Sequence, residues 1–369
     1  MFGVTLLRSF GRSNRHLARK QPLAGPDHHQ PKSSLLSGSG AAEASLHVRG
    51  KSLMPNVRDG RYKDQASIVL ENEMTRAEFV AQGARMVSLR DKRIEHEFLF
   101  QQEEAKYVSG RYGEPMANNQ AAGYDDMFPT IGECFYQHFP WKGTLLPGHG
   151  EVSSLYWDMV KGETSLTMSC RGVRLPYKLT RRVTMPAENQ LRFDYKLENL
   201  SSFPISYLWS AHPILRVEEG ARILLPEECR VATSGGSLSG RIGRFGHQFT
   251  WPICTDERGS KHDLSLIRSP SAHDGTSYFF IDRLKHGWCG MKYPSVNRTL
   301  TLSFPPETVP FIGVILGEGI IGDPRFLALL EPCTAPFGRL DNAHQYLADA
   351  QIPAAGAKEW FLAFSIESA

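Results

Sequence analysis

Alternation of apolar and polar residues is the pattern that most limits the fold of this chain, and it is clearest over residues 191–198. Every second residue there, from Leu191 to Leu197, is apolar, so a strand would bury one face and expose the other. Further short apolar runs recur from residue 66 onward, separated by turn residues. The 33 glycines and 23 prolines suit many short strands joined by turns. We therefore expect an all-β fold, a large antiparallel β-sandwich of roughly seventeen strands.

Two local expectations accompany this fold. Residues 205–209 are expected to run back beside residues 191–198 as a hairpin partner, because turn residues separate the two runs. The best helix lies over residues 341–350, where Asp341 is available as the N-cap.

The N-terminal 63 residues differ in composition from the rest. Arg8, Arg12, Arg15, Arg19 and Lys20 all precede the first acidic residue, Asp27. An Arg-rich, acid-poor N-terminus is typical of an organelle transit peptide, whereas the alternative that we favour is a disordered extension or non-native residues added by an upstream start codon. We expect a poorly structured extension over residues 1–63 and one β-sandwich domain over residues 64–369.

Composition argues against several classes of protein. The formal charge is only +3 and basic residues are dispersed, which disfavours nucleic-acid binding. No apolar run approaches the ~18 residues that a membrane-spanning helix needs. The six cysteines are scattered, without a CxxC motif or a histidine at zinc-ligand spacing. We therefore expect reduced, mostly buried thiols, no metal site, no membrane partner and a cytoplasmic protein, while the sequence leaves the oligomeric state open.

Three residues have the chemistry and the setting of acid–base groups. Glu331 follows the apolar run 326–330 and precedes Pro332, so a strand-end carboxylate losing hydration would have a raised pKa suited to a general base. The alternative is a glutamate paired with an arginine. His149 lies between two glycines ahead of a predicted strand, and His212 follows another predicted strand. Either histidine alone is more often a packed or hydrogen-bonded residue.

The motifs around these residues resemble the aldose 1-epimerase (galactose mutarotase-like) family over residues 66–366. Each motif is weak alone, whereas their order and spacing together are fairly specific. They are the Gly83-Ala84-Arg85 segment with the strand after it, Pro147-Gly148-His149-Gly150, Ala211-His212-Pro213, Leu330-Glu331-Pro332-Cys333-Thr334, and the final Gly356-Ala357-Lys358-Glu359-Trp360 segment.

The resemblance implies a large antiparallel β-sandwich that binds a sugar in a groove. It implies that Glu331 takes the proton from the anomeric hydroxyl of the sugar while His212 protonates the ring oxygen. His149 would hold the substrate and support the developing charge. Such chemistry requires no metal and no organic cofactor.

The sequence departs from the family pattern ahead of the first histidine. The family's sugar-binding arginine has no unambiguous match, and Arg111 is the nearest guess. Asp125 and Asp126 lie in that region instead, where they are either sugar ligands or part of a turn. Asp282 resembles the family's substrate-binding aspartate, or it is a strand-end acid paired with Arg283.

The sequence therefore favours an aldose 1-epimerase whose partner is a small sugar. Two alternatives stay open, namely a non-catalytic carbohydrate-binding protein on the same scaffold and a sugar-cleaving enzyme. The first needs neither an acid nor a base, and the second would usually need two positioned carboxylates. The sequence does not indicate which sugar is bound or whether it is phosphorylated.

Overall fold

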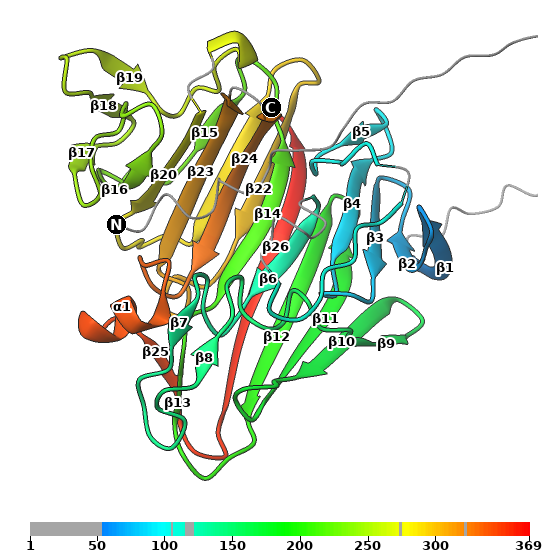
Figure 1. Cartoon of the computed structure of the whole chain (residues 1–369). Coiled ribbons are helices and arrows are strands. Elements are labelled where there is room, and N and C mark those ends of the chain that lie inside the picture. The colour runs from blue at the N-terminus through cyan, green and yellow to red at the C-terminus, as the bar shows by residue number, and fades with distance from the viewer. Residues whose placement is uncertain (1–53, 105, 115–121, 273–274, 321–322) are drawn as a thin grey trace, which may run out of the picture. The chain divides into compact units, whose positions relative to one another are not determined.

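The computed structural model describes residues 54–104, 106–114, 122–272, 275–320 and 323–369, and these form 26 strands and very little helix (Figure 1). All of the strand pairs between named strands for which a register is defined are antiparallel. The expected antiparallel β-sandwich is confirmed.

The larger sheet has 14 strands. Their spatial order is β1 (Asn56–Tyr62), β2 (Gln65–Glu71), β3 (Thr75–Val80), β4 (Met86–Asp91), β6 (Tyr124–Met127), β14 (Ser210–Arg216), β24 (Asp323–Cys333), β23 (Phe311–Ile320), β20 (Gly275–Ile281), β16 (Val231–Ser237), β17 (Gln248–Thr250), β18 (Ile253–Thr255) and β19 (Lys261–Asp263), with β5 (His96–Glu97) paired to β4.

The second large sheet has eight strands. Their order is β15 (Arg222–Leu224), β21 (Trp288–Tyr293), β22 (Arg298–Ser303), β26 (Ala357–Ser368), β12 (Gln190–Asn199), β11 (Tyr177–Ala187), β10 (Ser165–Arg171) and β9 (Asp158–Lys161). Two small sheets pair β7 (Cys134–Phe135) with β8 (Leu145–Leu146), and β13 (Ile205–Tyr207) with β25 (Ala350–Ile352). A 3-10 turn (Pro270–Ala272) and α1 (Leu340–Gln345) complete the elements.

The core lies between the two large sheets. The rings of Phe79 in β3 and Phe193 in β12 are 6.1 Å apart, and those of Tyr124 in β6 and Phe364 in β26 are 5.4 Å apart. Each pair joins one sheet to the other. β12 itself alternates between buried and partly exposed residues along most of its length, as its sequence predicts.

The predicted hairpin between residues 191–198 and 205–209 is wrong. β12 pairs with β11 and β26, whereas β13 pairs with β25, which lies much later in the chain. The turn after β12 was identified correctly, but the partner of β13 is set by a long-range contact that no local pattern reports.

The predicted helix is shorter than expected and has a different start. α1 begins at Leu340, its N-cap is Arg339, and no side chain caps it. Asp341 lies in the first turn and pairs with Arg339, whose Nε is 2.9 Å from the Asp341 carboxylate. Leu347 has a φ of 54°, a conformation that does not continue a right-handed helix.

The predicted start of the domain is also too late. Residues 1–53 of the expected extension lie outside the described residues, but residues 56–62 form β1 and pair along their whole length with β2. The residues of this strand are exposed or partly buried, and none is fully buried. It therefore lacks the apolar alternation that would have revealed it in the sequence.

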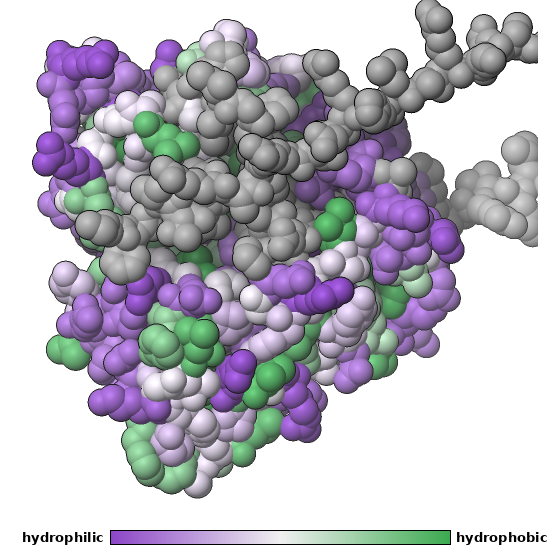
Figure 2. All heavy atoms as spheres, in the orientation of Figure 1, coloured by the Kyte–Doolittle hydropathy of each residue, from purple (hydrophilic) through white to green (hydrophobic). Residues whose placement is uncertain are grey.

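The surface and the cysteines agree with a folded globular domain. Figure 2 shows hydrophilic side chains over the β17–β19 end of one face and apolar ones nearer the β7–β8 hairpin, where Phe135 and Phe139 are exposed. The six cysteines are free and buried, as expected. Within the described ranges, no helix is long and apolar enough to cross a membrane.

Candidate active site

Three neighbouring strands in the middle of the larger sheet bring the expected site residues together. β6, β14 and β24 lie side by side (Figure 1). His212 of β14 is in register with Asp125 of β6. The pairs Ser210–Cys333 and Ile214–Leu329 place His212 opposite Glu331 of β24. Asp125, His212 and Glu331 therefore form one row across three strands.

Two prolines, Pro213 and Pro332, lie within these strands. The sequence predicted that His212 follows its strand and that Glu331 ends its own, but β14 continues through Pro213 to Arg216 and β24 continues through Pro332 to Cys333. Between β14 and β24 no paired residues are found from Ala211 to Pro213. Proline has no N–H to donate to a ladder, so the ladder is interrupted where His212 and Glu331 face each other.

Asp125 and Asp126 point to opposite faces of the sheet, because successive side chains of a strand alternate. Asp126 is fully buried between the sheets. There it accepts hydrogen bonds from Tyr124 (2.8 Å) and Tyr195 (3.0 Å), and it forms an ion pair with Arg181 (2.8 Å). The expectation that Asp126 binds substrate is therefore corrected. Its carboxylate compensates the buried charge of Arg181.

Asp125 holds His212 in a defined orientation. Its Oδ1 is 2.8 Å from His212 Nδ1, and its Oδ2 is 2.6 Å from an Arg85 Nη that forms an ion pair with it. Burial would raise the pKa of Asp125, but the charge of Arg85 and the contact with His212 outweigh it and lower the pKa to about 2. Asp125 is therefore ionised and accepts from Nδ1–H, which leaves Nε2 of His212 facing Glu331.

Glu331 is a buried carboxylate with an unsatisfied oxygen. Its Oε1 lies 3.8 Å from His212 Nε2, too far for a hydrogen bond, and has no other partner. Burial raises the pKa of Glu331 to about 7, against the opposing charge of His212. The alternative of a glutamate paired with an arginine does not hold, since its only ion-pair partner in the described ranges is His212.

His149 completes the group from a loop. Its ring is 4.9 Å from the His212 ring at 84°, and its Nε2 is buried without a hydrogen-bond partner. Burial, aided by the nearby His212, lowers the pKa of His149 to about 3, so the ring is neutral near pH 7.

Gly150 fixes the position of this loop. Gly150 has a φ of 67°, and a Cβ there would lie 2.2 Å from the carbonyl oxygen of Phe128. Only glycine permits so close an approach.

An apolar wall lies beside Glu331. Phe280, Gly313 and Glu331 are neighbours across β20, β23 and β24. Phe280, Phe311 and Cys333 form a small cluster separate from the main core, against which Tyr278 packs. The site therefore combines unpartnered polar atoms of Glu331 and His149 with an aromatic surface, which is typical of small-molecule sites.

Two predicted residues are not brought to this site by any contact among the described residues. Asp282 follows β20, is exposed, and accepts from the backbone N–H of Arg283. Arg111 is exposed, and the ion pair that it forms is with Glu114.

Arg85 is the site residue that sequence reasoning missed. It was noted only as part of an opening strand motif, yet its side chain is 5% exposed and pairs with Asp125. The available signal was an arginine inside the apolar segment 84–89, because a buried charge requires a charged partner.

The comparison with known proteins supports the fold. No model of a protein family matches the chain, and no curated protein sequence matches it. A galactose mutarotase-like protein from Clostridium acetobutylicum has a structure with a TM-score of 0.61 at 12% identity, and the match covers 86% of this chain and 99% of that protein. A galactose mutarotase-like protein from Lactobacillus casei has a TM-score of 0.58 at 14% identity, and the match covers 82% of this chain and 100% of that protein. The fold is galactose mutarotase-like.

A third solved structure agrees. A galactose mutarotase related enzyme from Lactobacillus acidophilus has a TM-score of 0.58 at 14% identity over 82% of this chain and 97% of that enzyme. In this chain, the middle of the larger sheet of the mutarotase-like sandwich carries the row of Asp125, His212 and Glu331. At identities this low, the structural matches establish a shared fold and do not establish an activity. The activity must be argued from the chemistry of Asp125, His212 and Glu331.

Proposed function

We propose that the chain is an aldose 1-epimerase, which interconverts the α and β anomers of a free aldose or a close relative. The observation that carries the proposal is the pair of Glu331 and His212, whose facing atoms are 3.8 Å apart without a hydrogen bond. A buried carboxylate with a pKa of about 7 is matched to proton transfer near neutral pH. The mutarotase-like fold is consistent with this chemistry.

The reaction requires one base and one acid at two oxygens of the same carbon. Glu331 takes the proton from the anomeric hydroxyl, and the released electron pair forms the C1 carbonyl as the bond from C1 to the ring oxygen breaks. His212 donates the Nε2 proton to that ring oxygen. Rotation about the C1–C2 bond and the reverse steps close the ring with the opposite configuration. Atoms and charge balance without a redox partner.

Asp125 and Arg85 have positioning roles in this mechanism. His212 can act as the acid only with both ring nitrogens protonated: Asp125 accepts from Nδ1–H, and the proton on Nε2 is the one that passes to the ring oxygen. Arg85 holds the other carboxylate oxygen and keeps Asp125 ionised. His149, neutral and with a free Nε2, is placed to hydrogen-bond the sugar beside His212.

Access to the pair is a physical requirement of the proposal. His212 is 3% exposed and Glu331 is 2% exposed, so the sugar must contact side chains that present very little surface. Binding must therefore be measured directly alongside turnover.

The experiment is NMR magnetisation exchange between the anomers of glucose, galactose and their 6-phosphates, with ligand-observed binding in the same samples. We expect at least one of these aldoses to bind and to exchange its anomers faster than in buffer. A sugar that binds without any acceleration would contradict the enzyme and favour the carbohydrate-binding alternative.

A further inference from the structure

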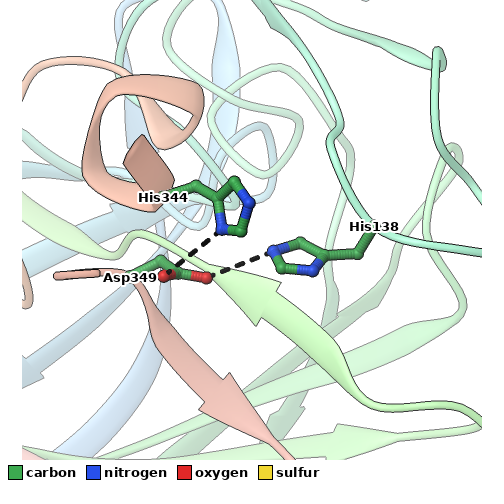
Figure 3. A group of neighbouring side chains, drawn as sticks. All are labelled: His138, His344 and Asp349. Atoms are coloured by element: carbon green, nitrogen blue, oxygen red, sulfur yellow. Dashed lines mark ion pairs between the residues drawn. The ribbon is translucent and has the colours of Figure 1, made fainter. Parts of the chain in front are cut away.

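A second cluster of ionisable side chains lies outside the proposed active site. His138 lies between β7 and β8, His344 is in α1, and Asp349 lies between α1 and β25. Figure 3 shows both imidazole rings turned toward the Asp349 carboxylate. Within the described ranges, this is the only group of three or more His, Cys, Asp or Glu residues whose donor atoms are close enough to hold one ion.

The three donor groups lie close together but are not hydrogen-bonded to one another. His138 Nε2 is 3.3 Å from Asp349 Oδ2, yet these atoms are not aligned for a hydrogen bond and have no other partner. His344 Nδ1 is 3.8 Å from Asp349 Oδ1 and is also buried without a hydrogen bond. Asp349 is only 5% exposed. Leaving three buried polar atoms unpaired is unfavourable, unless something binds between them.

We propose that His138, His344 and Asp349 bind one divalent transition-metal ion, with zinc as the best match. Zinc takes imidazole nitrogen and carboxylate oxygen at about 2.0–2.2 Å in a tetrahedron, which places ligand atoms roughly 3.3 Å apart. The His138–Asp349 separation already has that value, and all three donors lie within 4.8 Å of one another. A side-chain movement of about 1.5 Å or less therefore closes the set. Two imidazoles select against calcium and magnesium, which prefer oxygen ligands.

The ion would connect two segments that are distant in sequence. His138 is 206 residues before His344, so the short helix α1 and the loop after it would be tied to the β7–β8 hairpin. None of the three ligands belongs to the row of Asp125, His212 and Glu331. The ion would therefore stabilise this part of the fold, and anomer exchange would not depend on it.

The test is calorimetric titration of zinc chloride into metal-free full-length protein, with thermal unfolding in zinc and in magnesium. The background variant carries His28→Ala and His29→Ala, so that these two adjacent histidines, which lie outside the described residues, add nothing to the zinc that is bound. We expect one zinc per chain and a rise in Tm with zinc but not with magnesium. Asp349→Asn and His138→Gln should weaken zinc binding by at least ~100-fold, beyond the 10–100-fold typical of residues that only support a ligand.

The control is His262→Gln, which removes a histidine that pairs with Asp256 outside the cluster and should leave zinc binding unchanged. Cobalt, used as a probe, should give visible absorption bands of four-coordinate geometry that disappear in His138→Gln. Folding of each variant is checked by its metal-free Tm, and either ligand variant alone decides the outcome if the other does not fold. The site would be overturned if the background protein bound no zinc, or if both ligand variants bound zinc with the affinity of the background protein.

Discussion

Asp125 joins Arg85 to His212, with one carboxylate oxygen 2.6 Å from the guanidinium and the other 2.8 Å from the imidazole. All three side chains are buried. Because Asp125 is ionised, the imidazole is held with Nδ1 protonated and Nε2 directed toward Glu331. The direction in which His212 can pass a proton therefore depends on a residue that need not touch the substrate.

Asp125→Asn should reduce anomer exchange by at least ~100-fold per folded molecule, because an amide no longer fixes the imidazole tautomer. Asp126→Asn is the matched control, since Asp126 is the next residue but faces the core. Each change leaves a buried arginine without its charged partner and should cost about 3–5 kcal/mol of unfolding free energy. For each variant, the rate of anomer exchange is measured and divided by the fraction of the protein that is folded. Equal loss of rate in both variants would show that Asp125 acts only through stability.

Gly150→Ala should destabilise the fold by at least ~2 kcal/mol and displace His149, because the new Cβ meets the Phe128 carbonyl oxygen at 2.2 Å. Gly143→Ala is the control, because Gly143 also has a positive φ, of 88°, but no atom within 4 Å of the added Cβ. That change should cost only about 1 kcal/mol. Urea unfolding compares the two, and equal costs would show that the close contact at Gly150 is unimportant.

Stability should depend on pH through Glu331. Its pKa is about 7 in the fold and 4.5 in a model compound, so between these values the folded chain binds the proton and the unfolded chain does not. Stability from this residue is therefore present below about pH 4.5 and is lost as pH rises through 7, by up to about 3 kcal/mol. Glu331→Gln should become more stable than wild type as the pH rises from 5 to 8. Urea unfolding at both pH values checks this, and parallel changes in the two proteins would contradict the raised pKa.

The strands were the most predictable part of the molecule, because burial of one face leaves a period of two in the sequence. Residues 191–198 show this clearly. β1 escaped prediction because its residues are at most partly buried, and the partner of β13 escaped because β25 lies about 145 residues later. The local sequence pattern of a strand indicates which of its faces is buried, but it does not indicate which other strand pairs with it.

Site residues were predictable from the sequence where a short motif marks them, and unpredictable where their role depends on a contact with a residue distant in the chain. Glu331, His212 and His149 were marked by neighbouring Pro or Gly residues, and the structure brings them together. Asp125 and Asp126 could not be separated by sequence, because their difference is the face of the strand on which each lies. Arg85 required knowledge of its partner across 40 residues of chain.

The activity should follow the protonation state of Glu331. Only the ionised carboxylate accepts the anomeric proton and the reaction also needs an acid, so we expect a bell-shaped pH profile: the rate rises with pH about a midpoint near 7, where the pKa of Glu331 lies, and falls again at high pH as the acid is lost. The measurement is NMR exchange between pH 5.5 and 8.5. A rate that does not change across that range would contradict Glu331 as the base.

The central claim is most directly tested by Glu331→Gln, which keeps the size of the side chain and its capacity to hydrogen-bond but cannot accept a proton. Anomer exchange and sugar affinity are measured on the same samples, with His212→Gln beside it and His149→Gln as the variant expected to weaken binding as well as rate. We predict that Glu331→Gln slows exchange by at least ~100-fold while the sugar Kd changes far less. Exchange by Glu331→Gln at the wild-type rate would contradict the proposed mechanism.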